Sequence, residues 1–135
     1  MITSLFCYGT LQEKTVFETV SGLSVQSQSA SLEGYKRFRV ARADYPGIIP
    51  CDVSNVQGLV WHSIDLLALR KLDAFEGPFY QRKIVTIVTG DHAQKKAWAY
   101  VFAPNCQHLI TDEPWELDNY RAAFLKRFSL SPKRF

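Results

Sequence analysis

The chain has 135 residues, of which 47% are hydrophobic and 21% charged, and its formal net charge at pH 7 is +3. This composition excludes a disordered chain and predicts a single domain over residues 1–135 with its own hydrophobic core. No apolar run approaches the roughly 20 residues that span a bilayer, and the N-terminus lacks the pattern of a secretory leader. We therefore expect a cytoplasmic protein that does not bind membranes.

The N-terminal half is predicted to be mostly β-structure. Residues 2–8 are aliphatic and aromatic and are followed by Gly9, a pattern typical of a strand that ends in a turn. Residues 14–20 predict a short helix because Val16 and Val20 lie one turn apart. The other elements expected in this half are an extended segment at 27–42 interrupted near Gly34, a turn at 45–47, and strands at 48–53 and 57–64 separated by a turn at Ser54-Asn55.

The C-terminal half has clearer boundaries. Asp65 is suited to cap the helix that follows it, and Gly77-Pro78 is a helix stop. Residues 82–89 and 95–102 are rich in Val, Ile and aromatic side chains and predict a hairpin. Residues 111–114 are typical of a helix start, and apolar residues at helical spacing follow up to Phe128, which indicates a C-terminal packing helix.

Together these elements predict an α+β fold. Its six expected strands have few helices to cover them, so a closed or strongly curled sheet is more economical than an open one.

Glu76 is the strongest candidate for a catalytic residue. It follows Leu69 and Leu72 at i, i+3, i+7 spacing, so its carboxylate lies on the stripe facing the core if the helix reaches it, whereas Asp73 points elsewhere. Burial and the negative end of the helix dipole would raise the pKa of a carboxyl group there, which suits a general base near neutral pH. In the alternative interpretation the helix frays at Phe75 and Glu76 faces water.

The segment Tyr8-Gly9-Thr10-Leu11 is the second candidate. Gly9 permits a positive φ and close approach of a ligand to the backbone, and the amides after it can form a nest that binds an anion. The Thr10 hydroxyl adds a possible donor. The alternative is a plain turn after a strand, with Tyr8 filling the core.

The cysteines and histidines do not indicate a metal site. Cys7, Cys51 and Cys106 are odd in number and widely separated, which argues against a disulfide framework and a zinc site. His62, His92 and His108 show no ligand spacing. We expect reduced thiols, a buried Cys7 without a nucleophilic role, and no metal or cofactor.

Several segments together resemble the γ-glutamylcyclotransferase superfamily, and most closely its avirulence-induced-gene-like branch. The likeness covers most of the chain and depends on the order and spacing of short motifs. They are Tyr8–Leu11, Leu32–Phe38, Tyr45–Pro50, Gln57–Val60, Leu72–Gly77 with Tyr80 and Arg82, and the tail around Trp115, Tyr120 and Phe128.

This resemblance implies a small mixed β-barrel with flanking helices and a reaction that needs no cofactor. The loop Tyr8–Leu11 would hold a γ-glutamyl substrate, Tyr80 would line its pocket, and Glu76 would be the catalytic acid/base. The substrate's α-amine would attack its own γ-amide carbonyl and release 5-oxoproline and an amine or amino acid. The chain continues with Gln12-Glu13-Lys14-Thr15 where the family often has basic and glycine residues, so the leaving group stays open.

Two other functions compete with this one. A barrel of the same fold could bind a small anion or γ-glutamyl ligand without catalysis. Nucleic-acid binding is suggested by two clusters of basic residues. In the first cluster, the alternation of side chains along a strand places the charges on both faces of that strand, which favours a solvated surface without a nucleic-acid partner. The clusters are Lys36, Arg37, Arg39 and Arg42, and Lys126, Arg127, Lys133 and Arg134. The sequence does not predict the oligomeric state.

Overall fold

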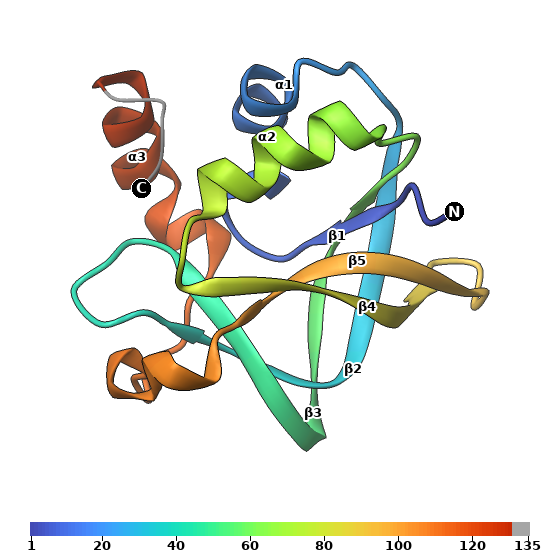
Figure 1. The fold of residues 1–135 in the computed structure, drawn as a ribbon. Helices are drawn as coiled ribbons and strands as arrows, with labels where there is room; N and C mark the ends of the chain where they lie inside the picture. The colour runs from blue at the N-terminus through green and yellow to red at the C-terminus, as the bar shows by residue number, and fades with distance from the viewer. Residues whose placement is uncertain (131–135) are drawn as a thin grey trace.

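A computed structural model describes residues 1–130 of the chain. Five strands form a closed barrel in the order β1-β3-β2-β4-β5 (Figure 1). The pairings are antiparallel except that of β1 with β5, which makes the barrel mixed. The strands are β1 (Leu5–Cys7), β2 (Ser27–Arg39), β3 (Pro46–Trp61), β4 (Tyr80–Thr89) and β5 (Gln94–Phe102).

Three α-helices and two short 3-10 helices accompany the barrel within residues 1–130. They are η1 (Thr10–Gln12), α1 (Lys14–Ser21), α2 (Leu66–Glu76), η2 (Pro104–Leu109) and α3 (Leu117–Leu130). Helices α1 and α2 lie side by side over β1 (Figure 1). None of the helices in residues 1–130 is long and apolar enough to cross a membrane.

The barrel has five strands instead of six because β3 is continuous. The predicted turns at 45–47 and Ser54-Asn55 are wrong: β3 starts at Pro46 and runs to Trp61, paired with β2 on both sides of one irregularity. The pairing shifts register between Glu33 and Tyr35, where Gly34 has a φ of 84° and residues 51–54 have no partner. Both strands bend there together (Figure 1). The polar segment therefore forms a bulge that curves the sheet.

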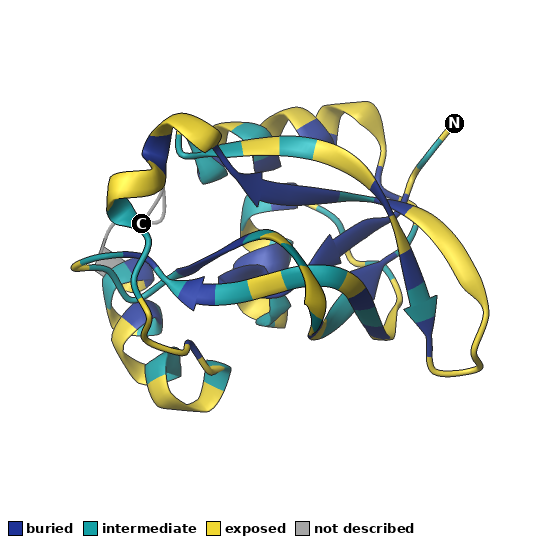
Figure 2. Ribbon diagram, turned by 90° about the horizontal axis from the view of Figure 1, so that it is seen from below, coloured by how far each residue is buried: buried dark blue, intermediate teal, exposed yellow. Residues whose placement is uncertain are grey.

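Three apolar clusters stabilise the described part of the chain, and the smallest of them packs Phe38 and Val40 with Phe102. The barrel interior is filled by strand side chains such as Phe6, Ile48 and Ile87, each fully buried. Alternating buried and exposed residues along the strands separate this interior from solvent (Figure 2). The second cluster lies between the barrel and the helices, where Phe17 of α1 stacks on Trp61 with ring centroids 4.2 Å apart.

Helix α2 has the predicted boundaries. The Asp65 carboxylate accepts a hydrogen bond from the Ala68 amide at 2.8 Å, which caps the first turn. Gly77 ends the helix with a φ of 79°, a conformation that glycine adopts readily. Because both ends are fixed, the direction of the last side chain, Glu76, is also fixed.

The C-terminal helix α3 begins later than predicted. Thr111, expected near its start, donates its hydroxyl to the Arg39 carbonyl at 2.6 Å and accepts the Glu113 amide at 3.2 Å. This turn docks the segment against β2, and the helix starts at Leu117. Its packing role is confirmed, since Phe124 and Phe128 are buried against the other helices and the barrel.

Candidate active site

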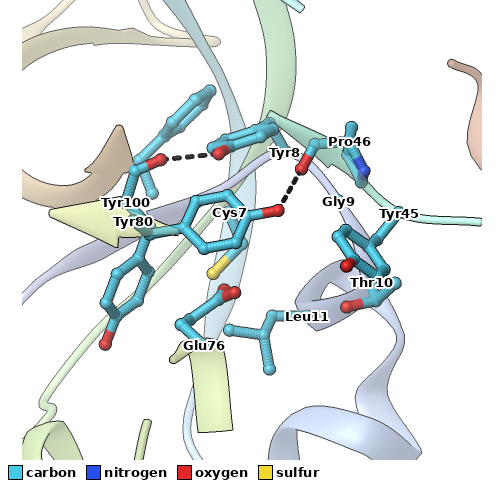
Figure 3. Close-up of a pocket in the computed structure, with 11 residues that line it drawn as sticks. Cys7, Tyr8, Gly9, Thr10, Leu11, Tyr45, Pro46, Glu76, Tyr80 and Tyr100 are labelled. Atoms are coloured by element: carbon cyan, nitrogen blue, oxygen red, sulfur yellow. Dashed lines mark hydrogen bonds between the residues drawn. The ribbon is translucent and has the colours of Figure 1, made fainter. Parts of the chain in front are cut away.

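A pocket opens where β1 separates from its two neighbours. The pairing of β1 with β5 ends at Phe6 and Ala99, and that with β3 ends at Cys7 and Leu59. The chain then turns at Gly9 into η1, and a space of about 330 Å³, part of it open to solvent, remains between the walls. Its walls are Phe6, Cys7, Tyr8, Gly9, Thr10, Leu11, Tyr45, Pro46, Glu76, Tyr80 and Tyr100 (Figure 3).

Glu76 reaches this pocket from the last position of α2. Leu69 and Leu72 on the same stripe are buried, and Glu76 is half-buried at its end. The alternative in which the helix frays and Glu76 faces bulk water is therefore wrong. Figure 3 shows the carboxylate pointing into the pocket, below Cys7 and beside Leu11.

The charge of Glu76 affects its ionisable neighbours. Burial raises the pKa of the Cys7 thiol well above its ordinary value, and the nearby Glu76 carboxylate raises it further. The same two causes, in the same order, raise the pKa of the Tyr8 and Tyr100 phenols. Cys7 is thus a protonated thiol, which is a poor nucleophile. Among the described residues that line the pocket, Glu76 is the one with a carboxyl group.

Gly9 is required here for a reason other than the predicted one. Its φ is −128°, so the expectation of a left-handed conformation is not met. A Cβ at this position would instead lie 2.8 Å from Cγ of Pro46, which leaves no room for a side chain. The glycine therefore allows the loop to pack closely against the start of β3.

The loop Tyr8–Leu11 offers no free backbone carbonyl. Each carbonyl accepts a hydrogen bond from the protein: Tyr8 from the Arg37 guanidinium at 2.9 Å, Gly9 from the Gln12 amide at 3.0 Å, Thr10 from the Glu13 amide at 3.1 Å, and Leu11 from the Trp61 indole at 3.0 Å. The amides of Thr10 and Leu11 open η1, and the first N–H groups of a helix have no acceptor within it. The backbone of the loop is therefore arranged to donate hydrogen bonds.

Two tyrosine hydroxyls hold the walls of the pocket together. Tyr80 donates to the Pro46 carbonyl and Tyr8 to the Tyr100 carbonyl, each at 2.6 Å (Figure 3). The Tyr80 ring lines the pocket, but its hydroxyl proton is committed to Pro46. The structure thus brings together all six residues proposed from the sequence, namely Tyr8, Gly9, Thr10, Leu11, Glu76 and Tyr80.

Asp73 has a larger part in the site than its position in the sequence indicates. The expectation that Asp73 points elsewhere is wrong, because it lies one turn before Glu76 on the same face of α2. Its carboxylate accepts the Tyr100 hydroxyl at 2.7 Å and the Arg82 Nε at 2.8 Å. Arg82 in turn lies over the Trp98 ring, 4.2 Å from its centroid. Asp73 thereby fixes Tyr100, a wall of the pocket. The sequence gives one weak signal for this, a second carboxylate one turn before Glu76.

In the described part of the chain the basic clusters are divided between exposed side chains and internal contacts, with Lys36, Arg42 and Lys126 exposed. Arg39 pairs with Glu113, Arg127 pairs with Asp44, and Arg37 is half-buried over Trp115. The predicted solvated surface is thus partly replaced by internal contacts. Lys133 and Arg134 lie outside the described residues.

Comparison with known proteins gives a consistent assignment. The family model described as gamma-glutamyl cyclotransferase, AIG2-like, matches residues 5–117. The chain belongs to this family. The AIG2-like protein C of Arabidopsis thaliana is 32% identical over 132 residues, which cover 97% of the chain and 76% of that relative.

Solved structures of other proteins share the fold. A protein of Arabidopsis thaliana solved in solution has a TM-score of 0.70 at 27% identity, covering 96% of this chain and 87% of that one. A structure titled gamma-glutamyl cyclotransferase has a TM-score of 0.67 at 18% identity, covering 75% of this chain and 66% of that one. The family and the mixed barrel predicted from the sequence are confirmed.

Proposed function

We propose that this chain is a γ-glutamylcyclotransferase in which Glu76 is the general acid and base. The observation that carries this proposal is the position of Glu76, whose carboxylate faces the same pocket as the donor-rich loop Tyr8–Leu11. Membership in the cyclotransferase family supports it independently.

In the proposed reaction the substrate's α-amine attacks the carbonyl carbon of its own γ-amide. A new C–N bond closes a five-membered ring, and the bond from that carbon to the leaving nitrogen breaks. Glu76 accepts a proton from the attacking amine and returns one to the leaving nitrogen. The products are 5-oxoproline and a free amine or amino acid, and the step consumes no other reactant.

The pocket favours this reaction mainly by holding the substrate folded. Both reacting groups belong to one molecule, so confining the folded conformer supplies a high effective molarity. Aromatic side chains of Tyr45, Tyr80 and Tyr100 line the pocket and limit its space.

The loop is the proposed anion site. Because its carbonyls are already occupied, its amides and the Thr10 hydroxyl are the groups left to bind a substrate carboxylate or the developing oxyanion. In this proposal Tyr8, Gly9, Thr10 and Leu11 bind the substrate, and the Tyr80 ring packs against it.

A binding module without catalysis is less well supported. A site that only binds an anion loses affinity when a carboxylate lies in the same pocket, because like charges repel. A carboxylate at this position is suited to exchange protons with the ligand.

The test is a search for 5-oxoproline. The purified protein is incubated with γ-glutamyl dipeptides, γ-glutamyl-ε-lysine and glutathione, and the product is measured by mass spectrometry. On the substrate that is turned over, Glu76→Gln should lower kcat by about 100-fold or more, while Glu33→Gln, at an exposed position on β2, should not. A Glu76→Gln protein with the wild-type rate would refute the mechanism.

A further inference from the structure

Arg37 contacts the substrate loop from outside the pocket. It lies on β2, and its Nη1 donates to the Tyr8 carbonyl at 2.9 Å and to the Gln57 carbonyl at 3.4 Å. Its guanidinium carbon lies 5.5 Å from the centroid of the Trp115 ring. The side chain is half-buried and therefore held in one place.

The Tyr8 carbonyl determines where the next amide points. No peptide bond among the described residues is cis, and in a planar trans peptide the C=O and the following N–H point in opposite directions. The Tyr8 carbonyl faces the side of β2 and β3, where Arg37 and Gln57 lie. The Gly9 N–H therefore points away from that side, toward β5.

The pocket lies on that β5 side. Pairing of β1 with β5 ends at Phe6 and Ala99, and the next residue of β5, Tyr100, is a wall of the pocket. The Tyr100 carbonyl accepts the Tyr8 hydroxyl. The Gly9 N–H thus faces the space into which the Glu76 carboxylate also points.

We propose that Arg37 is a positioning residue, which holds the Tyr8–Gly9 peptide so that the Gly9 N–H donates to the substrate. This proposal rests on the proposed function, since it assigns a support to the same site. The positive charge strengthens the bond to the Tyr8 carbonyl, and polarisation of the peptide makes its N–H a better donor.

The test compares Arg37→Met with Arg39→Met. Arg39 lies two residues further along β2 and pairs with Glu113 and the Ala43 carbonyl, so it serves as the matched control. Two-dimensional NMR of the full chain follows the Gly9 amide resonance, and 5-oxoproline is titrated as the probe. Arg37→Met should move the Gly9 resonance and weaken 5-oxoproline binding roughly tenfold or more, as expected for loss of an oriented donor.

Arg37→Lys separates positioning from packing. It retains the charge and one donor for the Tyr8 carbonyl, so it should recover part of the affinity and of kcat/KM that Arg37→Met loses. It also covers the case in which Arg37→Met fails to fold. A role limited to packing on Trp115 would lower the melting temperature but leave the Gly9 resonance and the affinity unchanged.

Two results would overturn the proposal. One is a folded Arg37→Met protein with the wild-type Gly9 resonance and 5-oxoproline affinity. The other applies when Arg37→Met does not fold: it is an Arg37→Lys protein that loses affinity for 5-oxoproline while its Gly9 resonance stays at the wild-type position. Because the Gly9 resonance is measured without substrate, it tests Arg37 even if the wild-type protein makes no 5-oxoproline, a result that would refute only the proposed function.

Discussion

Gly9→Ala tests the close packing that shapes the substrate loop. An added Cβ would lie 2.8 Å from Cγ and 2.9 Å from Cδ of Pro46, well inside the contact distance of about 3.5 Å or more for carbon atoms. Pro46 cannot retreat freely, because it pairs with Arg39 in the sheet and its carbonyl accepts the Tyr80 hydroxyl. Overpacking of this kind costs about 1–3 kcal/mol of folding stability.

The assay is urea denaturation, with thermal unfolding as a second measurement. For a chain of 135 residues each kcal/mol lowers the melting temperature by about 3–5 °C. Gly90→Ala is the matched control, since a Cβ there would meet nothing within 4 Å and should change stability by about 0.5 kcal/mol or less.

Pro46→Ala supplies the decisive comparison, because it removes the two atoms that the new Cβ would meet. The double variant Gly9→Ala, Pro46→Ala should be more stable than the sum of the single effects by about 1 kcal/mol. Strictly additive effects, or a Gly9→Ala protein as stable as wild type, would refute the steric reasoning.

Three further predictions concern other parts of the molecule. Iodoacetamide should modify the half-exposed Cys51 before the buried Cys7, whose pKa is raised by burial. Modification of Cys51 should leave turnover intact. Mass spectrometry combined with an activity assay checks both expectations, and an early loss of activity that accompanies Cys7 labelling would contradict them. Above about pH 10 the unfolded chain releases the tyrosine protons that folded Tyr8 and Tyr100 retain, because burial raises the pKa of both. The free energy of unfolding is therefore unaffected by these groups below about pH 10 and falls above it by about 1.4 kcal/mol per pH unit for each group. Urea midpoints that stay constant above about pH 10 would contradict this prediction. Asp65→Ala should cost about 1 kcal/mol in urea denaturation by removing the cap of α2, and a neutral result would contradict the capping role.

The parts of the fold that the sequence predicted correctly depend on local signals. The ends of α2 are specified by Asp65 and Gly77, which act on backbone groups within one turn. The β4–β5 hairpin follows from two apolar runs around a short turn. The inward direction of Glu76 could be predicted because Glu76 lies on the same face of α2 as Leu69 and Leu72, which face the core.

The errors occurred where a partner strand decides the local conformation. Ser54-Asn55 carries turn chemistry, but it lies at the bulge opposite Gly34 in a long antiparallel pair, so the two strands bend together and the chain does not reverse. Thr111 likewise carries helix-cap chemistry, but the Arg39 carbonyl binds its hydroxyl. In both cases a contact with β2 overrides the local preference.

The site shows the same division between local and distant causes. Within the loop Tyr8–Leu11, the Gly9 and Thr10 carbonyls are satisfied by amides three residues ahead, an arrangement that a turn after a strand supplies by itself. The Tyr8 and Leu11 carbonyls need Arg37 from β2 and Trp61 from β3, which barrel closure brings to the back of the loop. The loop motif therefore indicates where a donor-rich loop can form. It does not indicate which side chains bind the Tyr8 and Leu11 carbonyls, because these side chains come from β2 and β3, and the motif carries no information on how those strands pair. Substitutions at Arg37 should therefore impair the loop as strongly as substitutions within it.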